Sequence, residues 1–299
     1  MSQGSYTLNY WNVPGRGESI RVILTLGGIK FENNFVPLPL PLENPENQSP
    51  PPFDDGTWGK LKPQVPLPFP LENPENQNPP PFDDGTWGEL KPQTPWGTLP
   101  TLLLPSGETI GQQRAILRYL GKLIKHEGNY LYPEEPETSA RVDGFMDMME
   151  DIWPILIGLN GADSMETAPL YSTMLGQGTL DDFLNPRMEK GNGDLATQFD
   201  FLENAISNQG PFLLGSTLSC ADILLFAAIS WWGAGVFPNM DKMLEGRPKI
   251  EKCIRAVGNI EAISEYYSSL KSSRNSMPVV GSTNYSDYYK NYHLLCGLD

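Results

Sequence analysis

Hydrophobic and polar positions predict short strands and helices in the first third of the chain. A β-rich segment at residues 6–10 is followed by turn residues, after which Ile20, Ile23 and Leu24 recur at helical spacing up to the glycine pair Gly27-Gly28. Two further segments, 30–36 and 101–104, are typical of strands. A helix then follows, with its apolar face formed by Ile116, Leu117, Leu120, Leu123 and Ile124. This order predicts an α/β unit.

The rest of the chain is predicted to be helical as far as about residue 270. Apolar residues recur at helical spacing in 142–156 and again in 195–206, whereas 158–193 reads as a loop. Ser219 and Asp222 have the spacing of a capping box before the apolar run 223–226. The predicted organisation is an α/β domain, an all-α domain and an extension, at residues 1–125, 133–270 and 271–299.

A duplication interrupts the α/β unit. Residues 36–64 and 65–93 are two proline-rich copies with a period of 29 residues, and they differ at three positions. They lack the periodicity of a helix or strand, so we interpret residues 36–93 as carrying a surface insertion. Only the second copy leads into the strand at 101–104, and Trp87 and Lys91, rather than Trp58 and Lys62, are therefore expected to reach a binding site.

Composition excludes several functional classes. The 299 residues include 21 basic and 36 acidic ones, and the resulting net charge of −15 disfavours binding to nucleic acid or to anionic membranes. Three scattered cysteines and two histidines suggest no disulfide framework and no metal site. The first residues resemble no secretion signal, and the uncharged run 223–239 reads as a buried helix, so we expect a cytoplasmic protein.

Four segments in order resemble cytosolic glutathione transferases, especially the sigma class. They are the opening segment 6–21, the stretch from Trp87 to Pro100, the helix start Gln112-Gln113-Arg114-Ala115-Ile116 and the capped helix at Ser219. The resemblance covers about residues 5–270 apart from one repeat copy. It implies a thioredoxin-like N-terminal domain, an all-α C-terminal domain, glutathione as co-substrate without a metal, and a homodimer.

The resemblance assigns catalysis to Tyr10 and Arg16. Tyr10 would donate a hydrogen bond to the sulfur of glutathione and favour the thiolate, because a free thiol with a pKa near ~8.5 is mostly protonated at neutral pH. Arg16 would add positive charge and hold the Tyr10 hydroxyl. From the pattern alone Tyr10 also reads as a core aromatic, and Tyr6, on the same face of the strand, is the nearest rival.

The resemblance also implies a glutathione site and an electrophile pocket. The glycyl carboxylate would bind Lys91 beside Trp87, and the cysteinyl unit would pair with the backbone before a cis Pro100. The γ-glutamyl carboxylate would lie at a helix N-terminus, whose amides attract anions. The expected glutathione ligands are Tyr10, Arg16, Trp87, Lys91, Thr98, Leu99, Pro100, Gln112, Gln113 and, toward the partner subunit, Asp151. The expected pocket residues are Trp11, Val13, Pro14, Trp153 and Ile157.

Two positions depart from the pattern of these transferases. Pro14 stands where arginine is frequent, and Gln113 stands where serine or threonine is usual. The main expectation is conjugation of glutathione to small apolar electrophiles. A glutathione-dependent isomerase and a non-catalytic structural or interaction protein on the same scaffold remain alternatives. The substitution at Gln113, the insertion and the tyrosine-rich tail favour the structural or interaction protein.

Overall fold

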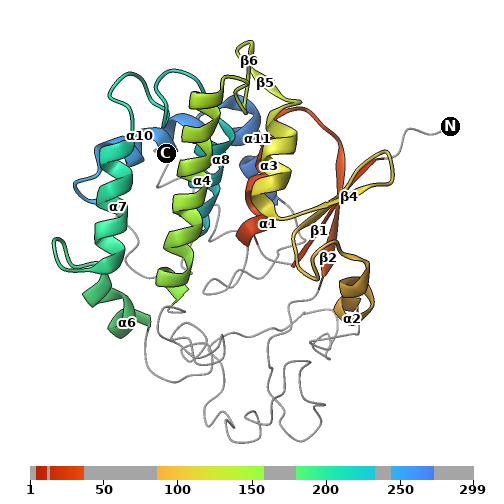
Figure 1. Ribbon diagram of the computed structural model, residues 1–299, viewed down its shortest axis with the longest axis horizontal. Helices are drawn as coiled ribbons and strands as arrows, with labels where there is room; N and C mark the ends of the chain where they lie inside the picture. Colours follow the sequence, from red (N-terminus) through yellow and green to blue (C-terminus); the bar gives the residue numbers. More distant parts are fainter. Residues whose placement is uncertain (1–4, 12–13, 37–85, 158–179, 233–243, 273–299) are drawn as a thin grey trace, which may run out of the picture.

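The computed structural model describes residues 5–11, 14–36, 86–157, 180–232 and 244–272, and the structural statements below concern these residues (Figure 1). Most of the two repeat copies, Val13 and the tail lie outside this set.

The N-terminal part forms a small mixed sheet with helices beside it. Its elements are β1 (Tyr6–Trp11), α1 (Gly15–Leu26), β2 (Phe31–Val36), α2 (Thr86–Leu90), the short 3₁₀ helix η2 (Lys91–Gln93), β3 (Thr101–Leu103), β4 (Thr109–Gly111) and α3 (Gln113–Gly121). The sheet order is β2-β1-β3-β4, with β1 and β2 parallel and the other pairs antiparallel. The expected α/β unit is thus confirmed, and β4 is a further strand of its sheet.

The inner face of this sheet supplies the N-terminal core. Along β1 the side chains of Leu8 and Tyr10 are buried while their neighbours are partly exposed, as the period of two requires. On α1 the apolar residues Ile20, Ile23 and Leu24 are fully buried. Helix α1 also packs against α3, and its first turn lies beside Tyr10 at the end of β1.

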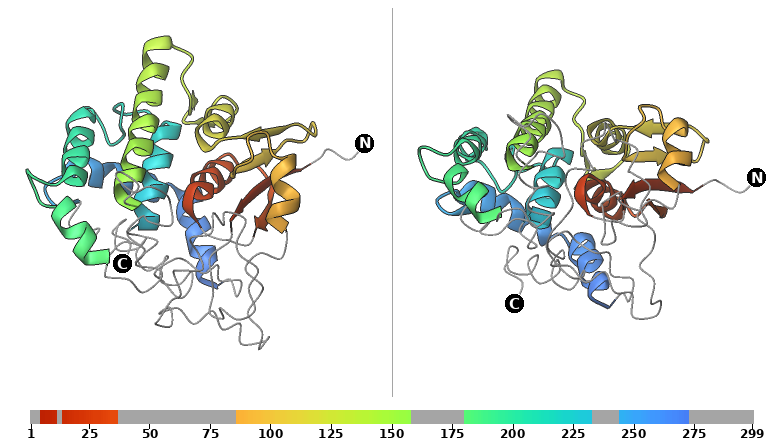
Figure 2. Two further views of the ribbon diagram at one scale, coloured as in Figure 1. Left: turned by 60° about the horizontal axis from the view of Figure 1, so that its bottom comes forward. Right: turned by 90° about the horizontal axis from the view of Figure 1, so that it is seen from below.

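In the described residues from 136 onward, the C-terminal part consists of helices and their connections, with α8 at its centre (Figure 2). Its helices are α4 (Pro136–Ile157), α6 (Leu180–Arg187), α7 (Asp194–Ala205), α8 (Cys220–Trp231), α10 (Pro248–Gly258) and α11 (Glu261–Ser272). Helix α8 packs against α1, α4 and α10 and is buried on nearly all sides. It begins at the expected capping box, in which the Asp222 carboxylate accepts the backbone N–H of Ser219 at 2.8 Å.

Two short elements were not expected. The polar joint contains a hairpin of β5 (Lys125–His126) and β6 (Asn129–Tyr130), whose two-residue strands are too short for a periodic signal. Helix α6 lies inside the segment that was interpreted as a loop. The sequence did not predict this helix because its eight residues include Pro186 and too few apolar positions to define a face. Among the described residues, no helix combines the length and apolarity needed to cross a membrane.

Candidate active site

Tyr10 lies at the end of β1 with its hydroxyl beside the start of α1. The side chain is 6% exposed, and its hydroxyl accepts a hydrogen bond from the backbone N–H of Arg16 at 2.9 Å. Since this bond uses a lone pair of the oxygen, the hydroxyl hydrogen remains available to a second group. Burial raises the pKa of Tyr10, and this effect outweighs the smaller lowering of the pKa by Arg16 and Arg21. The phenol therefore stays protonated at neutral pH.

Two glycines make room for the Tyr10 ring. A Cβ atom added at Gly15 would lie 2.6 Å from the Tyr10 hydroxyl oxygen, and one added at Gly17 would lie 2.5 Å from its Cδ1. Gly15 also has a φ of +41°, in the region that favours glycine. Sequence reasoning identified Gly15 and Gly17 only as turn signals; the structure shows that they let the ring lie against the first turn of α1.

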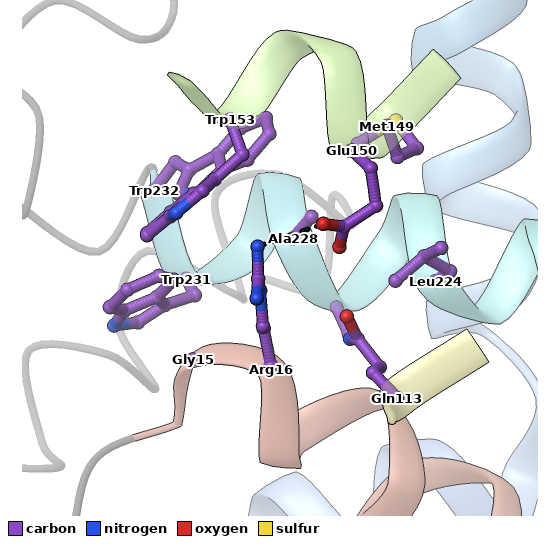
Figure 3. Close-up of a pocket in the computed structure, with 11 residues that line it drawn as sticks. Gly15, Arg16, Gln113, Met149, Glu150, Trp153, Leu224, Ala228, Trp231 and Trp232 are labelled. Atoms are coloured by element: carbon purple, nitrogen blue, oxygen red, sulfur yellow. Dashed lines mark hydrogen bonds and ion pairs between the residues drawn. The ribbon is translucent and has the colours of Figure 1, made fainter. Parts of the chain in front are cut away.

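The Arg16 side chain crosses from α1 to α4. Its Nη2 donates a hydrogen bond to Glu150 Oε2 at 2.8 Å, and its guanidinium lies 5.9 Å from the ring centroid of Trp153 (Figure 3). The positive charge of Arg16 is therefore paired with a carboxylate on α4. From the sequence, Glu150, the neighbour of Asp151, had no predicted role.

A cleft opens beside this ion pair. The starts of α1 and α3, the end of α4 and the length of α8 form its walls. Its lining residues are Gly15, Arg16, Gln113, Met149, Glu150, Trp153, Leu224, Ala227, Ala228, Trp231 and Trp232. Trp153 stacks on Trp231 and Trp232 with centroid distances of 5.5 and 6.3 Å, which gives the cleft an aromatic wall (Figure 3).

The predicted pocket residues are only partly brought together. Trp153 lines the cleft, whereas Trp11 and Pro14 are not among the described lining residues. Trp11 instead makes an edge contact with Trp87 at 5.1 Å. Pro14 caps α1, and its carbonyl accepts a hydrogen bond from Arg21 Nη1 at 3.3 Å. Val13 and the Ile157 side chain lie outside the described set.

The start of α3 presents a backbone suited to an anion. Gln112, which is exposed and has φ 74° and ψ 120°, precedes the helix without making a side-chain cap. The free N–H groups of the first turn and the helix dipole favour negative charge there. Gln113, by contrast, is only 7% exposed, and its Nε2 donates a hydrogen bond to Ser19 Oγ at 2.8 Å.

The remaining predicted glutathione ligands lie near β3 and on α4. Trp87 is buried in α2, and Lys91 begins the next short helix, with its side chain beside Gly97. The expected cis peptide bond joins Leu99 to Pro100, and Thr98 before it is exposed. Asp151 is exposed on α4.

Tyr6 is separated from this arrangement. Its hydroxyl lies 3.4 Å from the hydroxyl of Tyr119 on α3. Tyr6 begins β1, whereas Tyr10 lies near the opposite end of the strand. Of the two candidate tyrosines, Tyr10 alone contacts the turn that begins α1.

Comparisons with known proteins agree with this fold. A family described as "Glutathione S-transferase, C-terminal domain" matches residues 187–270. Glutathione S-transferase 1 of Ascaris suum is 24% identical, over 87% of this chain and 94% of its own length. Probable glutathione S-transferase 7 of Caenorhabditis elegans is 25% identical, over 74% of this chain and 76% of its own.

Solved structures of the same kind share the fold. The monomeric Na-GST-3 of Necator americanus aligns over 90% of this chain and 99% of its own, with a TM-score of 0.59 and 19% identity. A Pi-class transferase of Onchocerca volvulus aligns over 94% and 99%, with a TM-score of 0.58 and 19% identity. The matched C-terminal region, the curated relatives and the shared fold together make the chain similar to glutathione S-transferases over most of its length.

Proposed function

We propose that this protein is a glutathione transferase that joins the glutathione thiolate to small apolar electrophiles, with Tyr10 stabilising the thiolate. The observation that carries the proposal is the Tyr10 hydroxyl. It accepts the Arg16 N–H at 2.9 Å and keeps its own hydrogen for a sulfur placed at the start of α1. A hydrogen bond to the charged form of a thiol lowers its pKa, and a shift of about two units from ~8.5 would make the thiolate the main form at neutral pH.

The thiol in this reaction belongs to the co-substrate. Burial raises the pKa of the Cys220 thiol to about 12 and also raises that of Cys253, and both are enclosed in the helical core. Buried thiols of this kind are poor nucleophiles. Among the described residues, the protein therefore supplies the hydrogen-bond donor, and glutathione supplies the nucleophile.

Glutathione would extend from the start of α3 to Lys91. Its γ-glutamyl carboxylate would meet the amides that follow Gln112, and its cysteinyl backbone would pair with Leu99. Lys91 and Trp87 would hold the glycyl end. The exposed carboxylate of Asp151 would serve a second subunit in a homodimer.

The electrophile would enter the cleft lined by Trp153, Trp231 and Trp232. In this cleft an indole wall favours apolar and planar molecules. The thiolate attacks the electrophilic carbon, a carbon–sulfur bond forms, and the leaving group departs with the bonding electron pair. Detoxification of such compounds and membership of the sigma class are part of the proposal.

The isomerase alternative has one supporting observation, the charged Arg16 beside the cleft, which could hold an anionic substrate. Conjugation requires only the groups described above, and we favour it.

Retention on immobilised glutathione, followed by conjugation of 1-chloro-2,4-dinitrobenzene, tests the proposal. Tyr10→Phe should lower the rate at neutral pH by about 10- to 100-fold, because the thiol returns toward its ordinary pKa. Tyr6→Phe is the matched control and should leave the rate nearly unchanged. Wild-type protein that neither binds glutathione nor conjugates would favour the scaffold alternative.

A further inference from the structure

We propose that the side chains of Gln113 and Ser19 position Arg16, and through its backbone the Tyr10 hydroxyl. Gln113 thus acts as a positioning residue and not as a side-chain ligand of the γ-glutamyl carboxylate. The inference rests on the proposed function and deepens it, since it assigns a role to Gln113, which stands where the transferases that the chain resembles usually have serine or threonine.

A chain of hydrogen bonds connects the start of α3 to the catalytic turn. Gln113 Nε2 donates a hydrogen bond to Ser19 Oγ at 2.8 Å. Ser19 Oγ in turn donates a longer hydrogen bond, of 3.4 Å, to the backbone carbonyl of Arg16. The N–H of the same Arg16 donates to the Tyr10 hydroxyl at 2.9 Å. Both peptide groups that flank the Arg16 Cα are therefore held, one by Tyr10 and the other by Ser19.

Burial makes this chain of bonds energetically significant. Ser19 is fully buried and Gln113 is 7% exposed, so neither can exchange its partner for bulk water. A buried polar group that loses its partner costs more than an exposed one, and the two residues are therefore expected to depend on each other.

The bond directions also fix the orientation of the Gln113 amide. Ser19 has one hydroxyl hydrogen, which goes to Arg16, so its oxygen must accept from Gln113 Nε2. The amide oxygen, a hydrogen-bond acceptor, is left for the side of the cleft (Figure 3). An acceptor repels a carboxylate, so the backbone amides of α3 are left to hold the γ-glutamyl group.

A double-mutant cycle of Ser19→Ala and Gln113→Leu tests the proposal in the full-length protein. Each single substitution should lower kcat by about three- to tenfold, with less than about a twofold change in KM for glutathione. The double variant should lose no more than either single one, because both break the same connection. Ser139→Ala is the matched control: Ser139 Oγ makes the same contact to a carbonyl three residues earlier, that of Pro136, at 3.0 Å at the start of α4.

The contrary result is equally specific. If the Gln113 side chain binds glutathione directly, Gln113→Leu raises KM for glutathione, Ser19→Ala leaves both constants unchanged, and the proposal is overturned. Gln113→Glu, which keeps the shape and removes the Nε2 donor, replaces the leucine variant if that variant does not fold. It should also lower kcat with little change in KM, and an unchanged kcat would overturn the proposal.

A spectroscopic measurement separates this proposal from the proposed function. The ¹³Cζ signal of Tyr10, assigned by its loss in Tyr10→Phe, should shift in ligand-free Ser19→Ala and Gln113→Leu protein and stay in place in Ser139→Ala. If the Tyr10 signal shifts in these variants but the wild-type protein shows no conjugation, the positioning role is supported and the enzyme activity is refuted. An unmoved signal in an active enzyme would refute the positioning role alone.

Discussion

The Tyr10 ring lies so close to the first turn of α1 that Gly17 has no room for a side chain, since a Cβ there would be 2.5 Å from Tyr10 Cδ1. Strand β1 and helix α1 are therefore in close contact at this point. The predictions below follow from this fit and from the charges around it.

Gly17→Ala should disturb the site more than a methyl group normally would. The added carbon must displace the Tyr10 ring, and we expect a loss of stability of about 1–3 kcal/mol together with at least about a tenfold loss of kcat. Urea unfolding and steady-state conjugation would measure the two effects. Gly88→Ala, whose Cβ meets nothing within 4 Å on the short helix α2, is the control and should change stability by less than about 0.5 kcal/mol.

The pH dependence should report the thiol of glutathione and not the phenol. Because burial raises the pKa of Tyr10 above 10, the phenol remains a donor throughout the neutral range and would be lost only at a higher pH. The rate should therefore rise as pH increases through the pKa of the bound thiol, then reach a plateau. In Tyr10→Phe the rise should move to higher pH by about one to two units. An unmoved midpoint would contradict thiolate stabilisation by Tyr10.

Glu150→Gln should move the same midpoint in the opposite direction. The amide can still accept the hydrogen bond of Arg16, but the negative charge is gone, so the guanidinium stabilises a nearby thiolate more strongly. We expect a decrease of a few tenths to about one pH unit. Arg16→Gln should raise the midpoint. Glu251→Gln, which alters an ion pair of similar length to Arg255 on α10, should do neither.

The stability effect of Glu150→Gln should be small. The Arg16 and Glu150 side chains are 38% and 26% exposed, and partly solvated ion pairs contribute about 1 kcal/mol or less. A shift in the pH profile without a shift in the unfolding midpoint would thus separate the electrostatic role of Glu150 from a structural one.

The choice between the two repeat copies is tested by their lysines. Lys91 lies beside the loop that leads to β3, whereas Lys62 lies outside the described residues. Lys91→Ala should raise KM for glutathione by about tenfold or more, as expected for a lost charged hydrogen bond, and Lys62→Ala should leave it unchanged. The reverse order would assign the glycyl subsite to the first copy.

The sequence predicted those features that depend on neighbours along the chain. Strand alternation placed Tyr6 and Tyr10 on the same face of β1, and the spacing of Ser219 and Asp222 identified the start of α8. Both signals are local, because they depend on a period of two and on a separation of three residues.

Contacts between distant segments could not be predicted in this way. Glu150 meets Arg16 across 134 residues, and Gln113 meets Ser19 across 94. The stacking of Trp231 and Trp232 on Trp153 depends on how α8 packs against α4. The adjacent tryptophans at the end of an apolar helix were a visible signal, yet without the packing of α4 nothing distinguished a cleft wall from a core.

Asp222→Ala should be the most destabilising substitution considered, because it removes one carboxylate that serves four donors. The backbone N–H groups of Leu213 and Ser219 donate to it at 2.7 and 2.8 Å, and the Ser219 hydroxyl and the Cys253 thiol donate at 2.6 and 3.2 Å. Leaving these buried donors without an acceptor should cost about 2–4 kcal/mol in urea unfolding. Asp194→Ala, which removes an exposed carboxylate from the start of α7, should cost about 1 kcal/mol or less.

Burial raises the pKa of the Asp222 carboxyl in the folded state, so its contribution to stability is fully present below the unfolded pKa near ~4 and decreases as pH rises through the folded value. The difference in unfolding free energy between wild type and Asp222→Ala should therefore narrow as pH increases from acid toward neutral, and a difference that widens would show that the hydrogen bonds outweigh the burial of the charge.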